Sequence, residues 1–168
     1  MNTIARALLL AAAIGLGGLT LTSAQDSGAP PMIVSQPADE RAAQDLLPMS
    51  QDPLWSVLAK TKILIDEQQG LYDAEFPEDV KHLDGQPVTV TGFMLPLEAS
   101  DEFRHFLLSK RTPTCPFCPP GEPNEIVDVW TTDPVAWDDG AVTVTGKFTL
   151  MRDREMGLFF KLSEAALK

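Results

Sequence analysis

The sequence predicts a mainly β domain, a small five-stranded OB-like antiparallel barrel with an N-terminal helix. Two long segments, residues 88–95 and 142–150, share the phrase Val-Thr-Val-Thr-Gly, and each follows an Asp-Gly turn. This alternation of β-branched apolar residues with Thr is typical of a strand with one buried face. Shorter strand candidates lie at residues 103–109, 125–131 and 158–162. Five such strands favour a closed barrel, which leaves no free edges. The alternative is an open β-meander with the helix packed across one face.

The first 24 residues have the character of a cleaved export signal. A short basic lead containing Arg6 precedes an almost wholly apolar stretch, residues 7–21, which ends in the small residues Thr22-Ser23-Ala24. The apolar stretch is about 15 residues long, shorter than the roughly 20 that a membrane-spanning helix needs. We therefore expect a periplasmic protein with no membrane insertion after signal cleavage.

Residues 25–51 are rich in Pro, Ala, Ser, Gln and Asp and show no apolar period. Such a composition cannot bury enough apolar surface to offset the entropy lost on ordering. It predicts a disordered linker ahead of a barrel domain over residues 52–168. The alternative is a partner-binding peptide around residues 32–34.

An amphipathic helix is expected at the start of the domain. Asp52 is a favourable N-cap, and Pro53 fits the first helical position, where no intrahelical N–H is needed. The following apolar stripe predicts about 12 helical residues. The stripe consists of Leu54, Trp55, Leu58 and Ile65. Residues 76–80 predict a further short turn of helix.

The first long strand changes its apolar phase after Gly92, from Val88 and Val90 to Phe93 and Leu95. A glycine bulge that inserts one extra residue produces such a shift and bends the strand. A long strand bent in this way can serve two sheets at once.

The charge of the chain argues against nucleic-acid binding. Its 168 residues include 24 acidic and 13 basic side chains, a formal net charge of −11. Proteins that grip phosphates cluster Lys and Arg, and here the longest basic run is Lys110-Arg111. The sequence also lacks a Gly-x-Ser-x-Gly elbow, a Gly-rich phosphate loop and a His-Glu-x-x-His helix. We expect a binding or accessory module rather than an enzyme.

Both cysteines of the chain, Cys115 and Cys118, stand in one proline-rich segment, residues 111–124, which we call the Cys loop. Five prolines lie between Pro113 and Pro123. Proline fixes φ and removes a backbone donor. The loop therefore presents its two thiols in a restricted geometry, and we expect it to be the functional site.

Three interpretations of the cysteine pair remain open. In an oxidising compartment the two thiols form a disulfide that does no more than staple the loop. As thiolates they supply half of a tetrahedral site for zinc or copper(I). The third interpretation is thiol–disulfide exchange. It is weakened by residues 119–121, Pro-Pro-Gly, because no helix can begin after Cys118 and lower the thiol pKa.

A metal site needs further donors. His105 lies on the strand that leads into the Cys loop and is the third candidate ligand, whereas His82 precedes the first long strand and is expected on the surface. The carboxylates that supplement them are Glu122, Glu125 and Asp128.

Six short motifs follow one another along the chain in a specific order. They are Leu83-Asp84-Gly85, Gly92-Phe93-Met94-Leu95-Pro96-Leu97, Phe106-Leu107-Leu108, the Cys loop, Pro123-Asn124-Glu125-Ile126-Val127 and Val144-Thr145-Gly146. In this order, over roughly residues 54–166, the chain resembles the DUF3299 family of exported bacterial proteins. The resemblance implies a periplasmic barrel domain associated with metal-handling transport systems, with the Cys loop as the position that carries over. A periplasmic protein or transport system is accordingly the expected partner.

Overall fold

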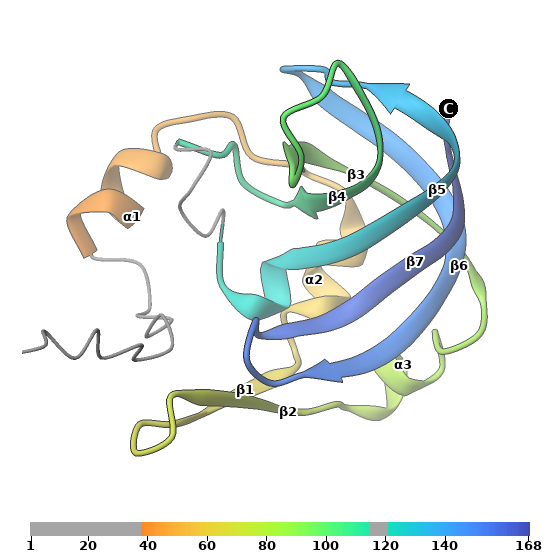
Figure 1. Ribbon diagram of the computed structural model, residues 1–168. Coiled ribbons are helices and arrows are strands. Elements are labelled where there is room, and N and C mark those ends of the chain that lie inside the picture. The colour runs from red at the N-terminus through yellow and green to blue at the C-terminus, as the bar shows by residue number, and fades with distance from the viewer. Residues whose placement is uncertain (1–37, 115–120) are drawn as a thin grey trace, which may run out of the picture.

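The computed structural model describes residues 38–114 and 121–168. Five strands dominate it (Figure 1). They are β3 (Pro87–Pro96), β4 (Glu102–Ser109), β5 (Ile126–Ala136), β6 (Ala141–Asp153) and β7 (Leu158–Leu167). All five lie where the sequence predicted strands, although β5 and β7 each run five residues further than predicted. The signal peptide predicted over residues 1–24 lies outside the described residues.

The strands form one closed, mixed sheet. They pair in the order β3-β4-β5-β7-β6, and β3 also pairs with β6. Four of these pairings are antiparallel and one, β5 with β7, is parallel. The mainly β fold is thus confirmed, but the prediction of a wholly antiparallel sheet is wrong. Five strands cannot alternate in direction all the way around a closed ring, so one pair must be parallel.

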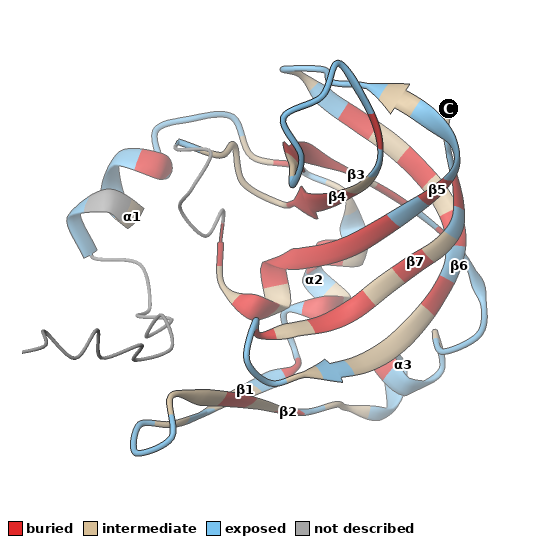
Figure 2. Ribbon diagram, viewed as in Figure 1, coloured by how far each residue is buried: buried red, intermediate tan, exposed pale blue. Residues whose placement is uncertain are grey.

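The interior of the sheet holds the main core, which Figure 2 shows as buried stretches along every strand. Burial alternates along most of β6, as the period of two predicts, whereas the end of β4 and the start of β5 are buried on both faces, where Leu95, Leu107 and Ile126 form a second, smaller cluster. The fully buried core side chains of the five strands include Val90, Phe106, Leu108, Val127, Val129, Val144, Phe148, Phe160 and Leu162. Burying side chains of this size stabilises the fold by roughly 1.5–3 kcal/mol each.

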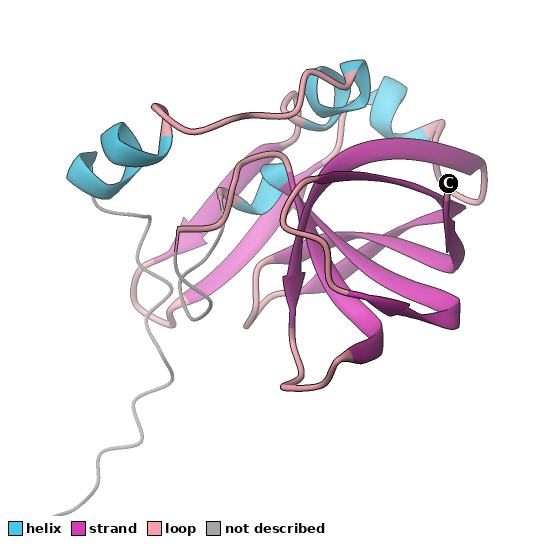
Figure 3. Cartoon of the chain, turned by 90° about the horizontal axis from the view of Figure 1, so that it is seen from above, coloured by secondary structure: helices cyan, strands magenta, loops and turns pink. Residues whose placement is uncertain are grey.

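Two short helices, α2 (Pro53–Leu58) and α3 (Glu78–Lys81), pack against this core, and the helices lie along one side of the strands in Figure 3. The side chain of Asp52 caps α2 by accepting from the Leu54 N–H at 2.9 Å, as predicted. Its other oxygen accepts from the backbone N–H of Thr91 at 2.9 Å. The indole N–H of Trp55, a residue only 1% exposed, donates to the Thr91 carbonyl at 2.7 Å. The start of α2 is therefore attached to β3.

The predicted 12-residue helix ends after six residues. The chain instead forms a hairpin, β1 (Lys62–Asp66) with β2 (Leu71–Glu75), turning at Gly70, whose φ is 65°. Ile65, predicted on the buried helical stripe, is 51% exposed on β1. The hairpin wins because Tyr72 and Ala74 of β2 become buried against the main core. The short helix predicted over residues 76–80 is confirmed as α3.

The sequence predicted a disordered linker over residues 25–51, and for residues 38–51 this is wrong. A helix, α1 (Ala38–Gln44), forms there, and Met49 makes a β-bridge with Arg111. Local composition does not reveal this order, because the contacts come from residues more than 40 positions away. Within the described residues, no helix is long and apolar enough to cross a membrane.

Gly92 marks the point where β3 changes partner. From Pro87 to Phe93 β3 pairs with β6, and from Phe93 to Pro96 it pairs with β4. The strand was predicted to serve two sheets through a bulge at Gly92, but both of its partners belong to one closed sheet, and the register runs through Gly92 without a shift. Glycine is needed for space instead. A Cβ there would lie 2.6 Å from the carbonyl oxygen of Ser109 and 3.2 Å from Trp55 Cζ2.

We expect Gly92→Ala to lower the free energy of unfolding by about 2 kcal/mol, because the clash is with backbone that must shift. Urea unfolding followed by tryptophan fluorescence measures this loss. Gly140→Ala is the control, since its Cβ would meet no more than the end of the Asp138 side chain at 3.1 Å. Equal destabilisation by the two variants would contradict the close-approach explanation.

Candidate functional site

The Cys loop joins two paired strand ends. Ser109 at the end of β4 pairs with Ile126 at the start of β5, so the two stems of the loop leave the sheet side by side. The backbone N–H of Lys110 donates to the Glu125 carbonyl at 3.0 Å and extends this pairing by one step. Cys115 and Cys118 lie outside the described residues, and the geometry below concerns the stems.

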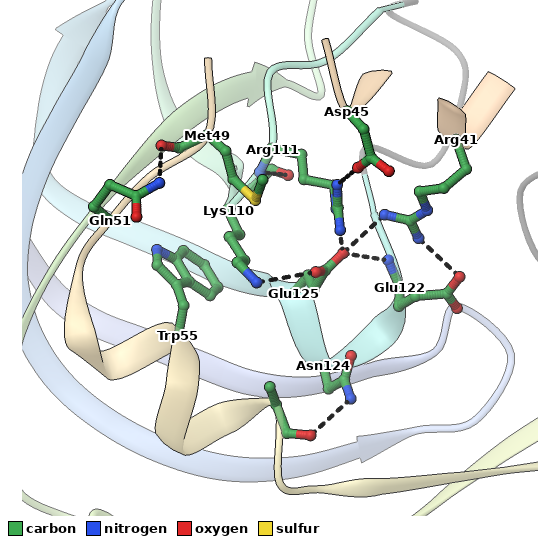
Figure 4. A network of polar contacts seen from close by, with 12 residues as sticks. Arg41, Asp45, Met49, Gln51, Trp55, Lys110, Arg111, Glu122, Asn124 and Glu125 are labelled. Atoms are coloured by element: carbon green, nitrogen blue, oxygen red, sulfur yellow. Dashed lines mark hydrogen bonds and ion pairs between the residues drawn. The ribbon is translucent and has the colours of Figure 1, made fainter. Parts of the chain in front are cut away.

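The carboxylate of Glu125 lies at the centre of the stem contacts and is 6% exposed (Figure 4). Its Oε2 accepts from Arg111 Nε at 2.8 Å and from Arg41 Nη1 at 3.0 Å. Its Oε1 accepts from Lys110 Nζ at 3.3 Å. One buried acid therefore joins both stems of the loop to helix α1, and we call these four residues the Glu125 cluster.

The electrostatics of the cluster favour the ionised acid. Burial by itself raises the pKa of Glu125, but the hydrogen bonds and charges of Arg111 and Arg41 outweigh it and lower the pKa from 4.5 to about 2. Burial disfavours the charged form of Arg111 too and by itself lowers the pKa of Arg111. The hydrogen bonds and charges of Glu125 and Asp45 outweigh burial, so the pKa of Arg111 lies above its usual value. The ion pairs are therefore fully formed at neutral pH.

The N-terminal segment runs beside the stem that leads to Cys115. The carboxylate of Asp45 pairs with Arg111, and Gln44 Nε2 donates to the Thr112 carbonyl at 3.0 Å. Thr112 Oγ1 in turn donates to the carbonyl of Pro48 at 2.7 Å. Side chains and backbone thus hold this stem from one side over several consecutive residues.

The second stem contains its own turn. Residues 123–125 form a short 3-10 helix, in which Glu125 Oε2 accepts from the backbone N–H of Glu122 at 3.4 Å. The Glu122 carboxylate pairs with Arg41 Nη2 at 2.8 Å. The sequence had offered Glu122 and Glu125 as metal ligands. In the structure arginine side chains occupy both carboxylates, so they serve to hold the stems.

His105 lies on β4 opposite Trp130 of β5. Its Nε2 lies 2.5 Å from Oδ1 of Asp128, whose side chain is nearly buried, and the Trp130 indole N–H donates to the other oxygen at 2.9 Å. The rings of His105 and Trp130 stack at 3.9 Å, and Lys161 Nζ lies 4.9 Å from the Trp130 ring centre. These contacts hold the imidazole ring in place through Nε2 and its face. Nδ1 is then the ring nitrogen left to bind a metal ion.

The structure separates His105 from the stems of the Cys loop. It stands four residues before Ser109 on β4, which is about 13 Å along an extended strand. Among the residues that the structure describes, no three His, Cys, Asp or Glu side chains gather closely enough to hold a metal ion. His82 is exposed at the end of α3, as predicted, with Nδ1 2.6 Å from the Glu78 carbonyl.

Sequence reasoning missed Arg41, Lys110 and Arg111 as partners of Glu125. The one available signal was the dipeptide Lys110-Arg111 at the head of the Cys loop, in a chain otherwise short of basic runs. Arg41 gave no local signal, because it reaches Glu125 from 84 positions away.

Comparison with known proteins gives one family. A family model described as "Protein of unknown function (DUF3299)" matches residues 36–160. Among solved structures, the crystal structure of a DUF3299 family protein from Pseudomonas aeruginosa PAO1 at 2.45 Å resolution is 27% identical in sequence. The match covers 57% of this chain and 68% of that one, with a TM-score of 0.46. No curated protein matches the chain.

Glu125→Gln should make stability less dependent on acid pH. A carboxyl whose folded-state pKa is depressed adds stability that is complete above its ordinary pKa, here 4.5, and is lost as the pH falls toward 2. The shift corresponds to about 3 kcal/mol. We expect the variant to be about 3 kcal/mol less stable at pH 7, because it leaves buried arginines unpaired, and to lose less stability than the wild type between pH 5 and 2.

Urea unfolding at a series of pH values tests this prediction, with exposed Glu67→Gln as the matched control. Parallel stability curves for the wild type and Glu125→Gln would contradict the assigned role of the Glu125 cluster.

Proposed function

The chain belongs to the DUF3299 family, and on this premise we propose that it is an exported binding or accessory module whose Cys loop takes up a thiophilic metal ion, zinc or copper(I). Cys115 and Cys118 are the proposed ligands, with His105 as third donor. The observation that carries the proposal is the Glu125 cluster, which holds together the two stems between which both cysteines stand.

Because the two stems of the Cys loop are fixed by these contacts, part of the conformational entropy of the loop is lost when the protein folds. Less is then lost when an ion binds, which favours binding. A site works when the elements beneath it position its ligands. Here Glu125 contacts three cations from two places: Lys110 and Arg111 on the stem before Cys115, and Arg41 on helix α1. Two thiolates at Cys-x-x-Cys spacing then need no large rearrangement of the sheet to share one ion.

The same contacts favour metal binding over thiol–disulfide exchange. Exchange requires a free thiolate, which nearby cations stabilise. The cations nearest to Cys115 in the chain are Lys110 and Arg111, and their charges are already balanced by Glu125 and Asp45. A bound Zn²⁺ or Cu⁺ supplies the missing positive charge itself.

The geometry of His105 agrees with the role of a ligand. Metal-bound histidines commonly use their second ring nitrogen to contact a carboxylate, which fixes the tautomer and the ring orientation. Asp128 holds Nε2 of His105 in this way and leaves Nδ1 for an ion. Because His105 stands four residues from the end of β4, the Cys loop must fold back over that strand for thiolates and imidazole to share one site.

The proposal extends to the fold and the compartment. The strand order β3-β4-β5-β7-β6, its closure between β3 and β6 and its one parallel pair support an OB-like barrel, a fold that commonly serves as a binding scaffold. The signal-like residues 1–24 support export to the periplasm. There a periplasmic protein or a transport system would be the partner.

Titration of Zn²⁺, and separately of Cu⁺, into the reduced protein tests the metal site. We expect sub-micromolar affinity for one of the two ions, and Cys115→Ser and Cys118→Ser should each weaken it about 100-fold or more, since each removes one of the two strongest ligands. Isothermal titration with a competing chelator measures both effects.

Counting free thiols in the protein as purified completes this test. Turnover in an insulin reduction assay without metal affinity would reject the metal site and favour a thiol–disulfide protein. A disulfide between Cys115 and Cys118, with neither metal binding nor insulin reduction, would show that the pair has only a structural role.

The two histidines provide a matched pair of variants. We expect His105→Gln to weaken binding of the preferred ion about tenfold and His82→Gln, at the exposed position that follows α3, to leave it unchanged. Chelator competition gives the affinities, and far-ultraviolet circular dichroism checks that both variants fold. Equal affinities for the two variants would remove His105 from the ligand set and leave the cysteines to be tested on their own.

A further inference from the structure

A cleft of about 480 Å³ lies between three segments that are distant in sequence. These are residues 93–96 at the end of β3, residues 112–114 of the Cys-loop stem and residues 137–139 at the turn between β5 and β6. Closure of the sheet brings the first and third segments together, because Phe93 pairs with Ala141. The cleft is separate from the Glu125 cluster and from His105.

The floor of the cleft is made of buried apolar residues, whereas its rim carries an exposed aromatic side chain. Phe93 and Leu95, which line it, are each 7% exposed and stand on the same face of β3. Trp137 at the rim is 57% exposed. The other two tryptophans are committed elsewhere, since Trp55 is buried in the core and Trp130 stacks on His105. The indole of Trp137 therefore stands at the mouth of an apolar hollow.

Two carboxylates follow this indole directly. Asp138 and Asp139 are exposed and line the same cleft. Asp138 Oδ1 accepts from the Gly140 N–H at 2.7 Å, which orients its carboxylate within the turn. An aromatic face beside carboxylates attracts cations through both its quadrupole and their charge. The net charge of −11 adds to this attraction at longer range.

We propose that the cleft is a docking site for a basic segment of a partner protein. An Arg or Lys side chain of that segment lies over Trp137 with its charge toward Asp138 and Asp139, and a neighbouring apolar side chain enters the hollow above Leu95. The charge of the rim selects this occupant, because phosphates of nucleic acids and anionic lipid surfaces would be repelled by it. This inference does not depend on the proposed metal site.

The size of the cleft favours a polypeptide over a small cation. Its volume lies in the range that holds several side chains or a drug-sized molecule, far more than one ammonium or guanidinium group fills. Pro96 and Pro113 also line it and add rigid apolar surface. A segment that alternates basic and apolar residues would use the charged rim and the apolar floor together.

The probe is an acetylated, fluorescein-labelled peptide of alternating Leu and Arg, with the same peptide carrying Glu in place of Arg as its charge-reversed counterpart. Fluorescence anisotropy measures binding, and ¹⁵N-resolved NMR follows the three indole N–H resonances. We expect binding of the Arg peptide that weakens with added salt, together with a shift of the Trp137 resonance that exceeds those of Trp55 and Trp130.

Variants locate the contact. Trp137→Ala and the double variant Asp138→Asn/Asp139→Asn should each weaken peptide binding about tenfold. The Asn variant keeps an acceptor for the Gly140 N–H, so the turn is preserved. The matched controls, Met156→Ala and Glu67→Gln, replace an exposed apolar residue and an exposed acid far from the cleft in sequence, and they should leave affinity unchanged.

The proposal is overturned if the Arg peptide does not bind, if the Glu peptide binds equally well, or if Trp137→Ala has no more effect than Met156→Ala. Equal affinity for free arginine amide would also overturn it, in favour of a small-cation site.

Discussion

The architecture depends on one constraint, the pairing of β3 with two partners. Phe93 is opposite Ala141 of β6 and also opposite Ser109 of β4. This double pairing closes the ring, and because a ring of five strands cannot alternate throughout, one pair, here β5 with β7, runs parallel. It requires Gly92, since no side chain fits between β3, the Ser109 carbonyl and Trp55. Helix α2 then attaches at Thr91, one residue before this junction. Closure also brings the end of β3, the Cys-loop stem and the β5–β6 turn to one place, where the cleft forms.

A second organising interaction is electrostatic. The buried carboxylate of Glu125 would destabilise the fold if it were alone, because ionised groups are costly to remove from water. Arg41, Lys110 and Arg111 offset this cost, and they come from helix α1 and a stem of the Cys loop. The cluster therefore ties helix α1 to the place where the chain leaves the sheet. It also explains why residues 38–51 are ordered although their composition is that of a linker.

Two surfaces emerge beside each other on the stem that leads to Cys115. Lys110 and Arg111 contact the Glu125 cluster, whereas residues 112–114 line the cleft beside Trp137. The stem is thus shared by the proposed metal-binding loop and the proposed docking site. A partner segment seated in the cleft would lie next to the chain that carries both thiols. In a binding or accessory module this arrangement would place a donor or an acceptor of the ion close to its ligands.

The amino-acid sequence by itself determined the five strands, the capped start of α2 and the position of both cysteines in one proline-rich segment, because alternation, capping and composition act over a few neighbouring residues. The tertiary structure decided the features that depend on contacts between residues distant in the sequence. The second half of the predicted helix, up to Ile65, became a strand of a hairpin because Tyr72 and Ala74 of the hairpin pack against the main core. Gly92 proved to be a place of close approach rather than a bulge, since the obstructing atoms belong to β4 and α2. Glu125 acquired its three cations, and His105 its Asp128, across separations of 14 to 84 residues. Contacts over such separations leave no local pattern, so only the folded chain reveals them.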